Sequence, residues 1–311
     1  MKIFVTGATG FVGSAIIQEL IGAGHQVVGL ARSDASAALL AAAGADVQRG
    51  ALDDLDSLKR GAEASDGVIH AGYNHDWLRA APSDFVAAIA AAAQTDRRAI
   101  ESLGDALAGS GRPFVVTSGT ALVAPGRMAT EDTPAPSDPS FPRVSEPVAL
   151  TMAARDVRVS VVRLPPSVHG VGDHAFVPGL IGIARGKGAS GYVDAGSNRW
   201  PAVHRLDAAR VYRLALEKAP AGSRLHAVAD EGVALREIAT VIGRQLNLPV
   251  ISVRSEQAGE HFGALARFVA LDCPASSALT QQLLGWRPAQ PGLIEDLQHP
   301  HYFASVPTPA R

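Results

Sequence analysis

The sequence predicts an α/β fold built on a doubly wound parallel sheet, with a smaller, discontinuous C-terminal lobe. Two observations carry this prediction. In the first half of the 311 residues, short and almost continuously apolar segments alternate with segments of helical spacing. This alternation is typical of parallel strands covered on both faces. In addition, a glycine-rich turn directly follows the first such strand and opens the first helix, as in sheets whose ligands bind beyond the C-terminal strand ends.

The first half of the chain contains six segments with the composition of buried strands. They are K-I-F-V-T (2–6), Q-V-V-G-L (26–30), A-D-V-Q-R-G (45–50), G-V-I-H-A (67–71), P-F-V-V-T-S (113–118) and V-R-V-S-V-V-R-L (157–164). Helical spacing and alanine content predict helices at 11–21, 83–109 and 144–155. A proline-rich loop at 124–142 is longer than an ordinary connection, and such loops are often functional.

After Pro165-Pro166 the pattern becomes less regular, with helices expected near 175–186, 206–218, 233–247 and 276–284. We expect the main domain to comprise residues 1–165, with 201–228 returning to it. The second lobe is expected to comprise 166–200 and 229–297. Residues 298–311, rich in proline, are expected to form an extended tail.

Composition limits the classes of partner. A net charge of −2 gives no reason to expect a nucleic acid, and no apolar run approaches the roughly 20 residues that span a bilayer. The N-terminus M-K-I-F-V-T-G reads directly as a strand, so we expect a cytoplasmic protein. The lone Cys273 excludes an intramolecular disulfide and is expected to be packed, and no spacing predicts a metal site.

The turn T-G-A-T-G-F-V-G (6–13) carries the first functional prediction. Glycines allow a tight turn and close backbone approach to a pyrophosphate, while the helix N-terminus supplies N–H groups and a positive dipole end. The pattern therefore predicts a dinucleotide site. Its expected ligands in this turn are Gly7, Thr9, Gly10, Phe11, Val12 and Gly13.

The end of the second strand, G-L-A-R-S (29–33), indicates which dinucleotide is bound. An acidic residue there would bind the two ribose hydroxyls of NAD, but the sequence has Arg32 and Ser33. A guanidinium makes charge-assisted contacts to a phosphate. We therefore predict NADP(H) as the preferred cofactor, with NAD(H) as the alternative.

These motifs resemble the extended form of the short-chain dehydrogenase/reductase family, the relatives of sugar-nucleotide epimerases. The resemblance extends to R-G-A-L-D-D-L-D-S-L (49–58), V-I-H-A-G (68–72), V-V-R-L-P-P-S-V-H-G (161–170), P-A-V-H-R-L-D-A-A-R (201–210) and L-G-W-R-P (284–288). It implies a Rossmann domain and a substrate-binding second lobe. It also implies further cofactor contacts at Leu52, Ala71, Gly72, Tyr73, Thr117, Pro165 and Ser167.

The resemblance fails at the catalytic pair of that family, Tyr-x-x-x-Lys between the fifth and sixth strands. The tyrosines are Tyr73, Tyr192, Tyr212 and Tyr302, and none has a lysine four residues later. The stretch 137–150 contains neither residue, although Arg143 lies near the expected lysine position. The chain thus looks like an atypical branch of the family.

Other groups can supply the proton that carbonyl reduction needs. The fifth strand ends in T-S-G-T, where the family keeps a catalytic hydroxyl, so Ser118 or Thr120 is a candidate. Arg143 can supply fixed positive charge but is a poor proton donor. The candidate donors are Tyr73 and one of the histidines His169, His174 and His75. Substrate contacts are expected from His75, Trp77, His174, Phe176 and Trp200, with ordinary core packing as the alternative for the aromatic rings.

The first hypothesis is an NADP(H)-dependent oxidoreductase of the atypical short-chain type, acting on a small carbonyl or alcohol. A second is an NADP-binding regulatory or sensor protein without chemistry, suggested by the missing Tyr-Lys pair. A third is epimerase- or dehydratase-like chemistry on the same fold. A homodimer through the helices at 83–109 and 144–155 is the default assembly for such folds.

Overall fold

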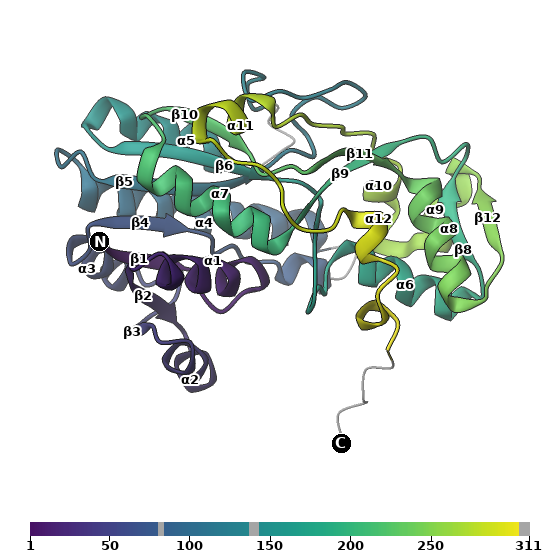
Figure 1. Cartoon of the computed structure of the whole chain (residues 1–311), viewed down its shortest axis with the longest axis horizontal. Coiled ribbons are helices and arrows are strands. Elements are labelled where there is room, and N and C mark those ends of the chain that lie inside the picture. The colour runs from purple at the N-terminus through teal and green to yellow at the C-terminus, as the bar shows by residue number, and fades with distance from the viewer. Residues whose placement is uncertain (80–83, 137–142, 305–311) are drawn as a thin grey trace.

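The computed structural model describes residues 1–79, 84–136 and 143–304 (Figure 1). The strands of the main domain are β1 (Lys2–Thr6), β2 (Gln26–Ala31), β3 (Asp46–Arg49), β4 (Gly67–His70), β5 (Pro113–Gly119), β6 (Arg158–Leu164) and β10 (Ser223–His226). They form one parallel sheet in the order β10-β6-β5-β4-β1-β2-β3. The predicted fold class is confirmed.

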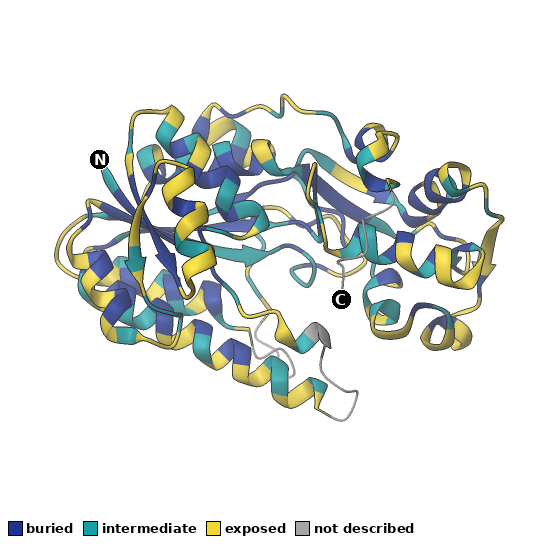
Figure 2. Ribbon diagram, turned by 90° about the horizontal axis from the view of Figure 1, so that it is seen from below, coloured by how far each residue is buried: buried dark blue, intermediate teal, exposed yellow. Residues whose placement is uncertain are grey.

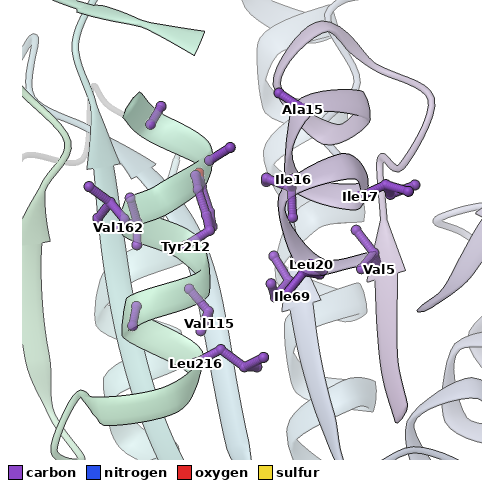
Figure 3. Packing of buried hydrophobic residues seen from close by; sticks show 14 of the residues in the cluster. Val5, Ala15, Ile16, Ile17, Leu20, Ile69, Val115, Val162, Tyr212 and Leu216 are labelled. Carbon is purple, nitrogen blue, oxygen red and sulfur yellow. The ribbon is translucent and has the colours of Figure 1, made fainter. Parts of the chain in front are cut away.

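Helices cover both faces of this sheet (Figure 2). One face carries α1 (Phe11–Gly22), α2 (Asp34–Ala42) and α7 (Arg205–Lys218), and the other α3 (Leu55–Glu63), α4 (Phe85–Leu107) and α5 (Ser145–Thr151), which continues into η2 (Met152–Arg155). Because side chains alternate along a strand, Ile3 and Val5 of β1 face α1 while Phe4 faces α3. Figure 3 shows α1 and α7 side by side, with Leu20 and Tyr212 among the buried side chains.

The strand order fixes where a ligand can bind. The chain leaves β1 toward β2 and β3, and the strands from β4 onward lie on the opposite side of β1. Such a reversal point opens a crevice beyond the C-terminal ends of the two strands.

The elements α2, α3 and β10 were not predicted from the sequence. The first two are short helices whose propensities alone are weak signals.

The second lobe packs beside the C-terminal strand ends (Figure 1). Its strands are β7 (Ser167–His169), β9 (Arg199–His204) and β11 (Asp230–Ala234) in one small sheet, with β8 (Ser190–Val193) and β12 (Val250–Val253) as a parallel pair. Its helical segments are η1 (Asp76–Arg79) at its border, α6 (Phe176–Lys187), α8 (Leu235–Leu246), η3 (Ser255–Gln257), α9 (Ala258–Phe262), η4 (Gly263–Leu265), α10 (Ala266–Val269), α12 (Leu293–Asp296) and η5 (Pro300–Tyr302). Helix α11 (Ala278–Leu284) contacts α7 and β10 instead.

The proline-rich loop is attached to the second lobe. Gly126 N donates to Asp272 O at 2.7 Å, and Glu131 accepts from both the N–H and the hydroxyl of Thr280. These contacts tie the described part of the loop to the segment around α11. Residues 137–142 of the predicted loop lie outside the described residues.

The prediction of an extended tail from 298 is wrong for its first part. Pro300–Tyr302 form η5, and the Tyr302 side chain is only 8% exposed. Its hydroxyl donates to Asp173 Oδ2 at 3.1 Å and accepts from Gly170 N at 3.2 Å. A buried aromatic ring with a satisfied hydroxyl holds this segment against the second lobe. Residues 305–311 lie outside the described residues.

Cys273 is buried, and burial raises the pKa of its thiol to about 12, which makes it an inert packed residue. No helix in the described part of the chain is long and apolar enough to cross a membrane. Within the same residues, no group of three or more His, Cys, Asp or Glu side chains is placed to hold a metal ion.

Candidate active site

The glycine-rich turn brings β1, α1 and β4 closer together than side chains would allow. Gly7 has φ of +67°, and a Cβ atom there would lie 2.5 Å from Gly72 N. A Cβ atom on Gly13 would lie 2.0 Å from Gly7 O. The turn is therefore formed by backbone alone, which is the shape that a pyrophosphate needs.

Helix α1 begins without a side-chain cap, because its N-cap residue is Gly10 and its first turn has no acidic residue. Its first N–H groups thus form the kind of helix start that binds anions. A cation stands beside them. Arg205 donates to Ser14 Oγ at 2.7 Å and to Val171 O at 3.0 Å, and its Cζ lies 4.6 Å from the centroid of the Phe11 ring.

Arg205 was not predicted from the sequence, although it lies in the quoted segment 201–210. The sequence showed Arg205 only as a basic residue just before the helix predicted at 206–218, which does not indicate contact with a cofactor. Its position beside the α1 N-terminus depends on the packing of α7 against α1. Together, the uncapped helix, the glycine backbone and this cation fit a dinucleotide pyrophosphate.

The two polar residues predicted to bind the ribose end of the cofactor have different surroundings. Arg32 follows β2 directly, is exposed, and has no ion pair among the described residues. Ser33 is the N-cap of α2, and its hydroxyl accepts from Ser36 N at 3.2 Å. The Ser33 side chain is therefore engaged within the protein, which leaves the Arg32 guanidinium as the predicted phosphate ligand at this position. Leu52 is half-buried near Gly72.

The other predicted cofactor contacts lie at the C-terminal ends of β4, β5 and β6. Ser167 follows the buried Pro165, and its Oγ has no hydrogen-bond partner among the described residues although the side chain is 2% exposed. A buried hydroxyl without a partner is expected to be satisfied by a ligand or water. In contrast, the Thr117 hydroxyl already contacts His70 O and Tyr212 Oη, each at 2.8 Å.

Two of the catalytic candidates are fully buried. A side chain that meets a substrate arriving from solution needs some exposed surface, but His169 and Thr120 are both 0% exposed. His169 Nδ1 lies 2.8 Å from Asp296 Oδ2, and the His169 ring packs edge-on against His204. His169 and Thr120 are therefore closed to solvent in this structure, although His169 Nε2 and Thr120 Oγ1, like Ser167 Oγ, have no hydrogen-bond partner among the described residues. Ser118, half-buried near the end of β5, remains the hydroxyl candidate there.

Tyr73 and Arg143 are brought together at the same edge. Tyr73 follows β4 and is half-buried, whereas Arg143 precedes α5 and is exposed. The guanidinium Cζ lies 4.3 Å from the centroid of the Tyr73 ring, in a cation–π contact. Arg143 also donates to Thr117 O at 3.2 Å and to Ser145 Oγ at 3.0 Å. A phenol ring and a fixed positive charge are thus in contact at this edge.

The environment of Tyr73 keeps its hydroxyl protonated. Burial raises the pKa of Tyr73, the charge of Arg143 lowers it, and the charge of Asp96 raises it again, so that the net direction is upward from 10.0. At neutral pH this phenol is therefore a hydrogen-bond donor that retains its proton.

Aromatic rings continue from Tyr73 into the second lobe. The ring centroid of His75 lies 5.1 Å from that of Tyr73 and 6.1 Å from that of Trp77. The Trp77 ring in turn lies 6.3 Å from Phe268 of α10. Two of the predicted substrate residues, His75 and Trp77, therefore belong to one run of rings that joins the two lobes.

The remaining predicted substrate residues lie in different surroundings. Trp200 is 0% exposed, donates from Nε1 to Phe268 O at 3.2 Å, and is part of the second-lobe core, which is the core-packing alternative for this ring. Phe176 packs on that core, with its ring 5.5 Å from Trp200. His174 is exposed and sits with its ring 5.8 Å from Phe11, near the glycine turn.

Comparisons with known proteins place these features in context. The family model described as "NAD dependent epimerase/dehydratase family" matches residues 3–228. The chain is 50% identical over 304 residues to "Uncharacterized protein C2A9.02" of Schizosaccharomyces pombe, and the match covers 97% of this chain and 100% of the relative. It is 27% identical over 281 residues to 4-hydroxy-2-methyl-3-oxo-4-farnesyl-3,4-dihydroquinoline-1-oxide ketoreductase of Stigmatella aurantiaca, covering 85% of this chain and 80% of the relative.

Among solved structures, the chain is similar to the UDP-glucose 4-epimerase of Thermus thermophilus in complex with NAD. The TM-score is 0.74 at 19% identity, and the match covers 98% of this chain and 100% of that chain. At this identity the similarity shows a shared fold.

Proposed function

Since this chain belongs to the NAD dependent epimerase/dehydratase family, we propose that it is an NADP(H)-dependent oxidoreductase acting on a small carbonyl or alcohol substrate. The observation that carries the proposal is the contact between Tyr73 and Arg143, with the guanidinium 4.3 Å from the ring centroid. The sequence has no Tyr-x-x-x-Lys pair. The contact supplies a hydroxyl and a positive charge at the edge of the sheet where such a pair would be needed.

The dinucleotide would be held by the glycine turn, the α1 N-terminus and Arg205, with Arg32 at its ribose end and Ser167 at the opposite end. When bound, it supplies the hydride of the reaction. The chain's own part is to orient the substrate and to move a proton. Tyr73 is the proposed proton donor to the substrate oxygen, and Ser118 a second hydrogen bond to it. Arg143 stabilises the negative charge that develops on that oxygen.

The raised pKa of Tyr73 means that the phenol is protonated at neutral pH, which is the form that a carbonyl reduction uses. A phenol whose pKa is raised above 10.0 gives up a proton to a developing alkoxide but is a poor base toward an alcohol at neutral pH. We therefore propose that carbonyl reduction with NADPH is the reaction to assay first.

The run of rings formed by His75, Trp77 and Phe268 supports an apolar substituent on the substrate. The alternative of epimerase- or dehydratase-like chemistry rests on the family itself and on the fold shared with sugar-nucleotide enzymes. The two alternatives require different substrates and can be separated by assay.

Replacing Arg32 with alanine is expected to weaken NADPH binding and to leave NADH binding unchanged. A ligand that binds the folded state raises stability by about 2.7 kcal/mol at 100 times its dissociation constant, so thermal shift reports both affinities. Arg98, exposed on α4, provides the control variant Arg98→Ala. An equal loss for both nucleotides, or no loss for NADPH, contradicts a role for Arg32 in phosphate recognition.

Carbonyl reduction is expected to appear as NADPH consumption with apolar aldehydes and ketones in a panel that also contains nucleotide sugars. Turnover of nucleotide sugars with no net NADPH consumption would instead favour epimerase- or dehydratase-like chemistry. Binding of NADPH with background turnover across the whole panel would favour a regulatory or sensor protein.

A further inference from the structure

A chain of buried polar side chains connects the glycine turn to Arg143. Thr6, His70, Asp96 and Ser145 come from β1, β4, α4 and α5, and all four are at most 3% exposed. None of the motifs in the sequence points to them as a group. Their contacts form one continuous path through the main domain.

The donors and acceptors along this path are fixed by chemistry. Gly72 N donates to Thr6 Oγ1 at 3.2 Å, and Thr6 Oγ1 lies 2.7 Å from His70 Nδ1. His70 Nε2 lies 3.1 Å from Asp96 Oδ1, and a carboxylate only accepts, so His70 carries its proton on Nε2. The other Asp96 oxygen accepts from the Ser145 hydroxyl.

Asp96 is charged in this setting. Burial raises the pKa of Asp96. The hydrogen bond and charge of His70, the charge of Arg143 and the hydrogen bond from Ser145 lower this pKa by more, so the net shift is downward. A buried carboxylate of this kind fixes the direction of the hydroxyl that donates to it. Because Ser145 donates its hydrogen to Asp96, its lone pair faces Arg143 Nε, which donates to it at 3.0 Å.

Besides the bond to Ser145, two described contacts hold Arg143 in place. Its side chain is exposed, and its other described contacts are a 3.2 Å bond to Thr117 O and the stacking on Tyr73. A long side chain on the surface loses conformational entropy when it is fixed. The bond to Thr117 O ties Nη2 to the backbone of β5, and the bond to Ser145 ties Nε to the buried polar network.

We propose that Ser145, oriented by Asp96 and His70, is a positioning residue that holds the Arg143 guanidinium against the Tyr73 ring. The proposal rests on the proposed function in one respect: its catalytic meaning requires Tyr73 to be the proton donor. The charged and titratable groups around the Tyr73 hydroxyl are Arg143, Asp96 and the neighbouring His75. Removal of Ser145 lets Arg143 leave Tyr73 without altering any of these charges.

The test uses the variant Ser145→Ala, which leaves every charge of the network unchanged. In NMR spectra the Arg143 Nε–H signal, assigned by its loss in Arg143→Lys, is expected to carry the upfield ring-current shift of a group stacked on Tyr73. In Ser145→Ala this signal is expected at the position of a solvent-exposed arginine. Ser145→Thr, which retains the hydroxyl, is expected to restore the shift.

Titration of Tyr73, followed with labelled tyrosine and assigned with Tyr73→Phe, provides a second readout. Tyr73 is expected to titrate at higher pH in Ser145→Ala than in the wild type, because the cation has left the ring. Ser160→Ala, a buried serine of β6 with no described partner, is the control and is expected to change neither signal.

An Arg143 signal and a Tyr73 titration in Ser145→Ala that match the wild type would overturn the proposal and leave Ser145 a purely structural residue. Both measurements are made without substrate or cofactor. Failure of the carbonyl assay would therefore count against the proposed function but not against the positioning role of Ser145. An unchanged Arg143 signal and Tyr73 titration would count against that role but not against the proposed function.

Discussion

Replacing Tyr73 with phenylalanine is expected to lower kcat for carbonyl reduction by about 10²–10⁴-fold, the usual contribution of a general acid. The substitution removes the hydroxyl and keeps the ring on which Arg143 stacks at 4.3 Å. The half-buried ring retains its packing, so the fold and NADPH binding are expected to be unchanged. Steady-state kinetics with NADPH and the best carbonyl of the panel measure kcat. A thermal shift with NADPH measures the folding and the cofactor binding of the variant.

A matched control exists elsewhere in the chain. Tyr192 of β8 also carries an arginine over its ring, with Arg236 Cζ 5.2 Å from the centroid, but it lies in the second lobe away from the glycine turn. Tyr192→Phe is expected to retain the wild-type kcat. If Tyr73→Phe also retains it, Tyr73 is not the proton donor, and Ser118 becomes the group to examine.

The second large effect concerns the buried pair Arg163 and Glu146. Arg163 of β6 is 0% exposed and binds Glu146 of α5 through two bonds, Nε to Oε2 at 2.7 Å and Nη2 to Oε1 at 2.6 Å. The guanidinium also donates to Thr133 O at 2.8 Å and lies 3.1 Å from His226 Nε2. The pair thereby joins the sheet, α5 and the proline-rich loop.

Arg163→Met is expected to lower the free energy of unfolding by about 3–5 kcal/mol, because it leaves the Glu146 carboxylate buried with one partner fewer. Arg224, about one-third exposed, still reaches Glu146 Oε1 at 2.8 Å and limits the loss. The double variant Arg163→Met, Glu146→Leu is expected to recover much of the stability, since no fully buried member of the pair remains and the partly exposed Arg224 can be hydrated. Denaturant unfolding of the single and double variants measures the coupling.

The surface pair Arg155–Asp105 provides the comparison, because its side chains are 44% and 60% exposed. Arg155→Met is expected to change stability by no more than about 1 kcal/mol. A loss in Arg163→Met as small as that, or a double variant less stable than Arg163→Met, would show that the buried pair does not carry the stability assigned to it.

The sequence by itself determined six of the seven strands of the main sheet and the glycine-rich turn. Apolar runs and glycine spacing are local signals, so the strands from β1 to β6 were predicted within a residue or two of their observed bounds. The requirement for glycine at positions 7 and 13 was also readable, because a tight turn whose backbone approaches a pyrophosphate favours residues without a Cβ atom. Arg32 at the end of β2 follows from the same local reasoning.

Burial and side-chain contacts between distant segments were decided only by the tertiary structure. His169 and Trp200 looked like pocket residues in the sequence but are 0% exposed, because His169 packs against Asp296 and His204 and Trp200 lies in the second-lobe core. Tyr73 and Arg143 gave no sign of being partners, since the sheet alone brings the end of β4 beside the start of α5.

The path from Thr6 through His70 and Asp96 to Ser145 was hidden for the same physical reason. Each of these residues is ordinary in its own segment and becomes significant through a hydrogen bond to a residue on another element. Local sequence patterns report the period of a strand or helix and the needs of a turn. Which polar groups meet in the interior depends on how the elements pack, and that packing is fixed only when the whole chain has folded.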